Sequence, residues 1–304
     1  MAAFFLQQFD GSYHDWFEGR APECCLLASI DDATGMITKI KFAENEGVLP
    51  VFDFWQEYLT LHGKPRSIYL DKFSTYKMNQ RVAIENHETL TQFQRAMRAL
   101  GVDVITAHSP QAKGRVERLF NTLQDRLIKE LRLAGISDMA AANRLVAETF
   151  LPAFNEKFHV EAKSKINLHR KLTAAEKRQL PSILSKHTER TIQNDFTFSF
   201  KNQWYQLIKC QPVTICRKDR VIVEEHTDGE VKIQLRGKYL NFILLSQRPK
   251  RSLADSWVLT TAKLEKSQQQ KQSKPQWKPS KDHPWRKQNL FAHKPLELTL
   301  SSKV

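Results

Sequence analysis

The 304-residue sequence has few cysteines, few acidic residues relative to basic ones, and no long apolar run. No run approaches the roughly 20 apolar residues that a membrane-spanning helix needs, so we expect no membrane partner. Residues 1–9 are apolar but short and lack a basic start, unlike a signal peptide. The four cysteines form no C-x-x-C pair and have no histidine at zinc-finger spacing, which favours buried, reduced thiols in the cytoplasm. They are Cys24, Cys25, Cys210 and Cys216.

The shortage of acidic residues leaves a formal net charge of +14, from 47 Lys or Arg against 33 Asp or Glu. Such a charge implies an anionic partner, and nucleic acid is the usual one. Residues 247–304 carry thirteen Lys or Arg against four Asp or Glu, together with five prolines and almost no apolar periodicity. We therefore predict a disordered basic tail, either a solubilising extension or an arm that grips phosphates. Salt would weaken its binding in either case.

Strands and helices alternate along the first third of the chain. Short apolar or alternating runs predict strands, and apolar residues at steps of three and four predict helices. The predicted order is strand, hairpin, helix, strand, helix, strand, helix, which is typical of a mixed sheet covered by helices. The predicted strands are residues 4–9 (ending at Asp10), 24–30, 36–42, 68–70 and 102–106, and the helices between them are 47–62 and 90–100.

A longer helix follows the fifth predicted strand. Its apolar residues form one stripe, made of Val116, Leu119, Phe120, Leu123, Leu127, Ile128 and Leu131. The pair Ser109-Pro110 suits an N-cap and a first helical proline, but Gly114 weakens a continuous helix, so we place the start between 110 and 115. Glu117 lies beside the stripe, at the border between core and solvent. Taken alone, it is an ordinary solvated residue of a helix start.

Two aspartates follow predicted strands, Asp10 after the first and Asp71 after the fourth. Alone, each is a turn former or a cap. If the two strands are neighbours, both carboxylates meet at one rim of the sheet, within reach of Glu117. Two carboxylates about 4 Å apart repel by about 4 kcal/mol at an effective dielectric near 20. Divalent cations such as Mg²⁺ offset this repulsion, and two ions about 4 Å apart promote phosphodiester chemistry.

Four motifs resemble the integrase catalytic core of DDE transposases from bacterial insertion sequences. They are residues 8–17 (QFDGSYHDWF), 30–35 (IDDATG), 70–72 (LDK) and 109–118 (SPQAKGRVER), within a match over about residues 8–160. The resemblance implies an RNase H-like fold in which Asp10, Asp71 and Glu117 hold two Mg²⁺ or Mn²⁺ ions. It also implies nicking of transposon ends and joining of the freed 3′ hydroxyl to target DNA.

The motif around Glu117 also bears the expected DNA contacts. The resemblance implies that Gln111 and Lys113 approach the cleaved phosphate, and Arg115 and Arg118 crowd around the acid on the same stretch. Joining two DNA ends implies a homo-multimer. We expect a cytoplasmic, nucleoid-associated bacterial protein, with Asp31 and Asp32 as structural turn residues and Glu44 and Glu46 as solvated surface.

The sequence departs from this family at two places. Between Asp71 and Glu117 lie 45 residues, more than is common in the superfamily, so we interpret the polar stretch 72–88 as an insertion beside the site. Only nine residues precede Asp10, whereas such transposases usually carry an upstream helix-turn-helix region. A truncated reading frame without that module is therefore an open alternative.

The second half of the chain changes character twice. Residues 138–158 predict a helix with Ser137 as N-cap and Pro152 kinking its end, and 161–188 a basic linker with a short helix over 174–180. From 190 to 245 the apolar period becomes two, which predicts five or six strands, one of them at 212–215, in a small antiparallel barrel or sandwich. Integrases often carry an SH3-like, DNA-binding barrel here; a dimerisation or packing domain is the alternative.

We therefore predict an α/β protein in four parts. Residues 1–160 form the RNase H-like core, 161–188 the linker, 189–246 the all-β barrel and 247–304 the tail. Three functions fit: a metal-dependent DNA transposase or integrase, a catalytically silent DNA-binding remnant of one, and an RNase H-type nuclease that cuts without joining.

Overall fold

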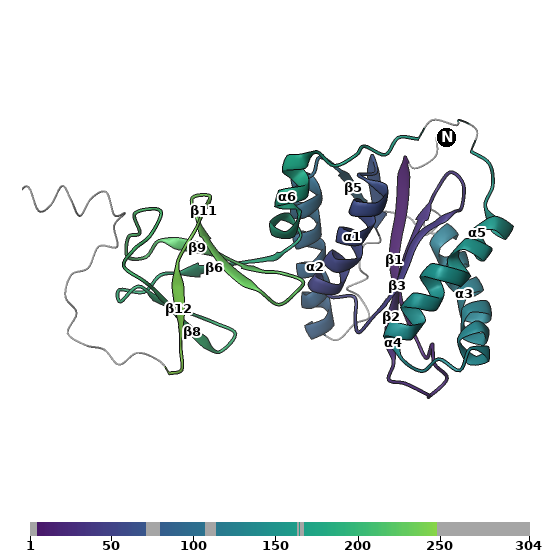
Figure 1. Cartoon of the computed structure of the whole chain (residues 1–304), viewed down its shortest axis with the longest axis horizontal. Coiled ribbons are helices and arrows are strands. Elements are labelled where there is room, and N and C mark those ends of the chain that lie inside the picture. Colours follow the sequence, from purple (N-terminus) through teal and green to yellow (C-terminus); the bar gives the residue numbers. More distant parts are fainter. Residues whose placement is uncertain (1–4, 71–79, 107–113, 163, 165–166, 248–304) are drawn as a thin grey trace, which may run out of the picture.

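The computed structural model describes residues 5–70, 80–106, 114–162, 164 and 167–247. Within this part of the chain, an α/β unit built from β1 to α6 is followed by a smaller β-unit built from β6 to β12 (Figure 1). The predicted tail, apart from its first residue, lies outside the described residues.

The α/β unit is built on a mixed five-stranded sheet, as predicted. Its strand order is β3-β2-β1-β4-β5. β1 pairs antiparallel with β2, which pairs antiparallel with β3, while β1, β4 and β5 run parallel. The strands are β1 (Leu6–His14), β2 (Cys24–Asp31), β3 (Ile37–Ala43), β4 (Ser67–Leu70) and β5 (Asp103–Thr106).

Helices cover both faces of this sheet (Figure 1). One apolar core joins the sheet to α1 (Val48–His62), α2 (Gln80–Ala99) and α6 (Ala174–Ile183). A second core, on the opposite face, joins it to α3 (Gly114–Leu133), α4 (Met139–Leu145), a π-helical turn η2 (Val146–Phe150) and α5 (Leu151–Phe158). Because β2 is buried along its whole length, its side chains alternate between the two cores.

Two helical predictions need correction. The helix predicted over 90–100 begins ten residues earlier, at Gln80, because residues 80–88 contain no glycine or proline. That the polar stretch 72–88 is an insertion stays a prediction. The helix predicted over 138–158 forms as an unbroken helical run over 139–158, with the π-helical turn η2 between α4 and α5. Its N-cap is Asp138, whose carboxylate accepts from the Ala141 N–H at 2.8 Å, and not Ser137. Pro152 lies directly after the π-helical turn η2, in the first turn of α5.

The segment predicted as a linker contributes to the α/β core. Leu172, Leu180 and Leu184 pack in the same cluster as α1 and α2. α6 begins with a capping box in which Thr173 and Glu176 satisfy each other's backbone N–H groups. The domain boundaries at 160, 188 and 246 stay a prediction.

The β-unit has two antiparallel sheets around a third apolar core. The orders are β11-β10-β9-β6 and β12-β8-β7, and the likeness to an SH3 barrel stays a prediction. The strand predicted at residues 212–215 does not form; Pro212 has no N–H for a ladder. The strands are β6 (Lys186–Thr191), β7 (Thr197–Phe200), β8 (Gln203–Leu207), β9 (Arg220–Glu225), β10 (Val231–Leu235), β11 (Lys238–Tyr239) and β12 (Phe242–Leu245).

The cysteines only half agree with the prediction of buried thiols. Cys24 and Cys25 are buried in β2, but Cys210 and Cys216 are exposed, because they lie in the turns between β8 and β9. All four are free thiols. No helix in the described part of the chain has the length and apolar character needed to cross a membrane.

Candidate active site

Asp10 lies within β1, four residues before its end, and not at a strand end as predicted. The strand continues because β2 pairs with it through His14. β4, in contrast, pairs with β1 only from Leu6 to Gln8. Asp10 therefore lies just past the paired part of the β1–β4 ribbon, on a half-buried stretch of β1.

Gln8, Asp10 and Ser12 share the face of β1 that α3 covers. Arg115, at the start of α3, approaches Asp32 at 3.3 Å, and the same Asp32 oxygen accepts from Gln8 Nε2 at 2.7 Å. Further along the helix, Gln124 Nε2 donates to Ser12 Oγ at 3.4 Å. These two links show that α3 and β1 run in the same sense.

On the helix, Glu117 lies between Arg115 and Gln124, which make these two links. On the strand, Asp10 lies between their counterparts Gln8 and Ser12. The predicted apolar stripe of α3 is buried throughout, so the helix is fixed against the sheet, while Glu117 itself is exposed in the first turn. A carboxylate there is favoured by the positive end of the helix dipole. The packing of α3 thus brings these two predicted site residues to the same part of the unit.

The other predicted site residues are placed less directly. Arg115 pairs with Asp32, and Arg118 Nε donates to the Gly114 carbonyl at 2.6 Å, so both guanidinium groups are engaged at the helix start. Asp71, Gln111 and Lys113 lie outside the described residues. Among the residues that are described, no three His, Cys, Asp or Glu side chains come together as a metal site.

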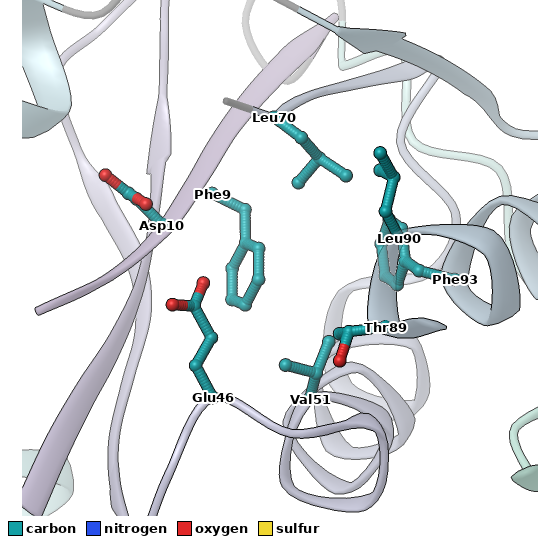
Figure 2. A pocket seen from close by; sticks show the side chains of 8 residues that line it. All are labelled: Phe9, Asp10, Glu46, Val51, Leu70, Thr89, Leu90 and Phe93. Atoms are coloured by element: carbon teal, nitrogen blue, oxygen red, sulfur yellow. The ribbon is translucent and has the colours of Figure 1, made fainter. Parts of the chain in front are cut away.

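A pocket between β1, β4, α1 and α2 has Asp10 and Glu46 in its wall (Figure 2). The rest of its lining is mostly apolar: Phe9, Val51, Leu70, Leu90 and Phe93, together with Thr89. In Figure 2 the carboxylate of Glu46, from the loop before α1, rises toward β1, and the Phe9 ring lies beside it. Our prediction that Glu46 is merely solvated surface is therefore wrong.

The approach of Glu46 to β1 depends on Gly11, the residue after Asp10. A Cβ at Gly11 would lie 2.8 Å from the Glu46 Cδ, 2.9 Å from its Oε2 and 3.0 Å from the Cys25 Sγ. Burial first, and then the negative charges of Glu46 and Asp10, raise the pKa of the Cys25 thiol far above its ordinary value. The Glu46 carboxylate thus lies close to this buried sulfur. A glycine inside a strand often marks the close approach of another group, so Gly11 was the feature of the sequence that could have indicated the approach of Glu46.

Asp31 is structural, as predicted, and Asp32 does more than form a turn. The buried Asp31 carboxylate accepts from the Thr34 N–H at 3.0 Å, the Thr34 hydroxyl at 2.7 Å and Gln7 Nε2 at 3.2 Å. Asp32, in contrast, ties the start of α3 to β1.

No protein-family model matches the chain. Among curated proteins, it is 37% identical over 237 residues to "Putative transposase y4bF" of Sinorhizobium fredii, covering 78% of this chain and 51% of that protein. It is 30% identical over 285 residues to the transposase for insertion sequence IS1202 of Streptococcus pneumoniae, covering 92% of this chain and 57% of that protein. The chain thus spans about half the length of these two relatives.

Solved structures give weaker likenesses. The HTLV-2 integrase catalytic core domain in complex with magnesium, in its trimeric form, is 17% identical with a TM-score of 0.35, over 47% of this chain and 82% of that one. A chain of the simian T-cell lymphotropic virus intasome in complex with PP2A regulatory subunit B56 gamma is 16% identical with a TM-score of 0.37, over 83% and 84%. TM-scores this low do not establish a shared fold. The two sequence alignments do confirm the predicted resemblance to transposases: over most of its length, this chain is homologous to these two bacterial proteins.

Proposed function

We propose that the chain is the catalytic part of a DDE-type DNA transposase, which nicks the ends of a mobile element and joins them to target DNA. The observation that carries this proposal is the pairing of β1 with β4 in parallel, next to α3. Asp71 directly follows the last residue of β4, and Asp10 lies two residues past the paired part of β1. In parallel neighbours, such residues belong to the same end of the sheet.

The same arrangement supports an RNase H-like fold with Asp10, Asp71 and Glu117 as its acidic triad. The donors are all carboxylates, which suit hard divalent cations such as Mg²⁺ or Mn²⁺. Two bound ions would supply Lewis-acid activation of the attacking and leaving oxygens.

The protein's own side chains orient the acids. α3 keeps Glu117 in place through its buried stripe, and the Arg115–Asp32–Gln8 chain of contacts fixes the start of the helix against β1. Gln111, Lys113, Arg115 and Arg118 would bind the DNA near the cleaved bond, and an SH3-like β-unit and the basic tail would bind it non-specifically. Joining two ends would require a homo-multimer.

Substitution of the three acids separates this function from its alternatives. We expect purified chain with Mg²⁺ to cleave DNA carrying the element's ends, and Asp10→Asn, Asp71→Asn and Glu117→Gln each to reduce cleavage by several orders of magnitude. Glu44→Gln, which neutralises an exposed carboxylate of the same unit outside the predicted triad, serves as the matched control. DNA binding without cleavage would identify a silent remnant. Cleavage without strand-transfer products would identify an RNase H-type nuclease.

A further inference from the structure

Within residues 167–247, the chain passes once from the α/β unit to the β-unit. α6 ends at Ile183, Leu184 still packs in the core with α1 and α2, and β6 begins at Lys186. A single short crossing of this kind is where two units would turn about a hinge. Side chains of α2 and α6 oppose such a movement, because they bind the β-unit at residues beyond the crossing.

The first of these contacts joins Gln92 of α2 to the backbone of His187 in β6. Gln92 Nε2 donates to the His187 carbonyl at 2.7 Å, and Gln92 Oε1 accepts from the His187 N–H at 3.2 Å. β6 is an edge strand of its sheet, in the order β11-β10-β9-β6. The Gln92 amide therefore takes the place of a neighbouring strand at this residue.

The second contact joins α6 to Glu224 of β9. The Glu224 side chain has no exposed surface, and the Ser182 hydroxyl lies 3.1 and 3.0 Å from its two oxygens. A buried carboxylate is costly unless it is hydrogen-bonded, so loss of Ser182 from this site is unfavourable. His187 and Glu224 are cross-strand partners in β6 and β9, so both contacts hold the same end of the sheet.

Arg95 of α2 holds the crossing itself and orients the Gln92 amide. Its guanidinium donates to the carbonyls of Ile183 and Ser185 at 3.1 and 2.7 Å, which the end of α6 leaves without a helical partner. Arg95 Nε donates to Gln92 Oε1 at 3.2 Å. Because only the oxygen of an amide accepts, this bond turns the Gln92 nitrogen toward the His187 carbonyl.

α2 also borders the candidate active site. Within one turn of Gln92, the side chains of Thr89, Leu90 and Phe93 line the pocket that has Asp10 in its wall (Figure 2). α2 is a helix of 20 residues whose apolar side chains pack in the core of the α/β unit. One fixed helix thus contacts both the surroundings of Asp10 and the start of the β-unit.

We propose that Gln92 and Ser182 are positioning residues, which hold the β-unit in one orientation so that DNA lying across both units keeps a fixed register at the catalytic acids. This inference rests on the proposed function, in which the β-unit binds DNA and Asp10 and Glu117 act on it. The stretch between β8 and β9 offers exposed basic side chains for phosphate contacts: Lys209, Arg217 and Lys218.

Distances between spin labels on the two units test the joint without any need for activity. Cys210 is exposed in the β-unit, and its carbonyl accepts from Asn241 Nδ2 at 3.1 Å, which holds the backbone there. Cys216→Ser removes the other exposed thiol, and Leu61→Cys adds a label site on exposed α1 surface. The two buried cysteines of β2 stay unlabelled, because burial raises their pKa and excludes the reagent.

In this labelled full chain we expect one narrow distribution of distances. The double variant Gln92→Leu with Ser182→Ala removes both contacts beyond the crossing, so its distribution should at least double in width. Gln94→Leu is the matched control: it makes the same exchange at another partly exposed glutamine of α2 and should keep the narrow distribution. A broad distribution without the two substitutions, or a narrow one in the double variant, would overturn the proposal.

The position of DNA cleavage separates a positioning role from a general loss of stability. On DNA that carries the element's ends, we expect the wild type to cut one phosphodiester and the double variant to cut several neighbouring ones. On a duplex too short to reach the β-unit, both should cut at the same rate, whereas destabilisation would slow both reactions alike. An unchanged cutting position in the double variant would overturn the positioning role. A wild type that never cuts would overturn the proposed function instead, and the label distances would still decide whether the joint is rigid.

Discussion

At Gly11 the absence of a side chain lets the Glu46 carboxylate approach β1 next to Asp10. The φ angle there is not positive, so the glycine is required for space and not for backbone conformation. The loop is fixed from the strand side as well, because the Glu46 N–H donates to the Tyr13 hydroxyl at 2.9 Å. β1 thus contributes three features: the candidate catalytic Asp10, the space at Gly11 that Glu46 occupies, and the Tyr13 hydroxyl that holds the Glu46 loop.

Gly11→Ala should cost about 1 kcal/mol, near the low end of the usual 1–3 kcal/mol for overpacking. The end of the Glu46 side chain can swing away at little cost, but the buried Cys25 sulfur at 3.0 Å must shift by a few tenths of an ångström. Urea denaturation would measure the change. Gly114→Ala is the control: its Cβ meets nothing within 4 Å, and alanine improves the helix start, so stability should stay or rise. An equal loss in both variants would contradict this account.

At the scale of elements, α3 decides where Glu117 lies. Two kinds of interaction hold the helix: the buried apolar stripe and the Arg115–Asp32 ion pair. The ion pair joins a half-exposed guanidinium to a partly exposed carboxylate, and such pairs contribute at most about 1 kcal/mol. Burial of leucines contributes more, about 1.5–3 kcal/mol for each side chain. The stripe therefore fixes the helix, and the ion pair adjusts its first turn.

Leu123→Ala should accordingly destabilise the α/β unit by about 2–5 kcal/mol, since Leu123 has no exposed surface and its removal leaves a cavity. Arg115→Gln should cost less than about 1 kcal/mol. Chemical denaturation monitored by tryptophan fluorescence reports on this unit through the buried Trp16 and Trp55. A larger loss for Arg115→Gln than for Leu123→Ala would show that the ion pair, and not the stripe, fixes α3.

On the scale of the whole molecule, positive charge is unevenly distributed. Residues 247–304 hold nine of the fourteen net positive charges. Each Lys or Arg that neutralises a DNA phosphate adds to the slope of affinity against salt concentration. The remaining residues carry a smaller excess, and some of their basic side chains pair with acids, as Lys41 does with Asp53 and Glu57.

Deletion of residues 248–304 should weaken non-specific DNA binding and reduce the salt slope by up to about 0.9 for each lost phosphate contact. Fluorescence anisotropy with a labelled duplex, measured across a series of salt concentrations, gives both quantities. Replacement of the same residues by a neutral Gly/Ser segment of equal length is the control for chain length. An unchanged slope would assign the contacts to the β-unit and the α/β unit instead.

The amino-acid sequence by itself determined most elements of the α/β unit and the stripe of α3, because periodicity follows from which side chains a helix or strand must bury. It also identified Asp10 and Glu117 as candidates, through motifs that resemble a known family. It misjudged the end of the first strand, since only pairing with β2 carries β1 on to His14.

Only the tertiary structure placed β1 beside β4, showed that Glu46 lies over Gly11, and joined Ser182, His187 and Glu224 into one cluster. These contacts join residues far apart in the chain, and no local pattern encodes them. A polar residue looks the same in sequence whether it faces water or a buried partner. The free energy of burial separates the two cases, and it depends on which neighbours the fold supplies.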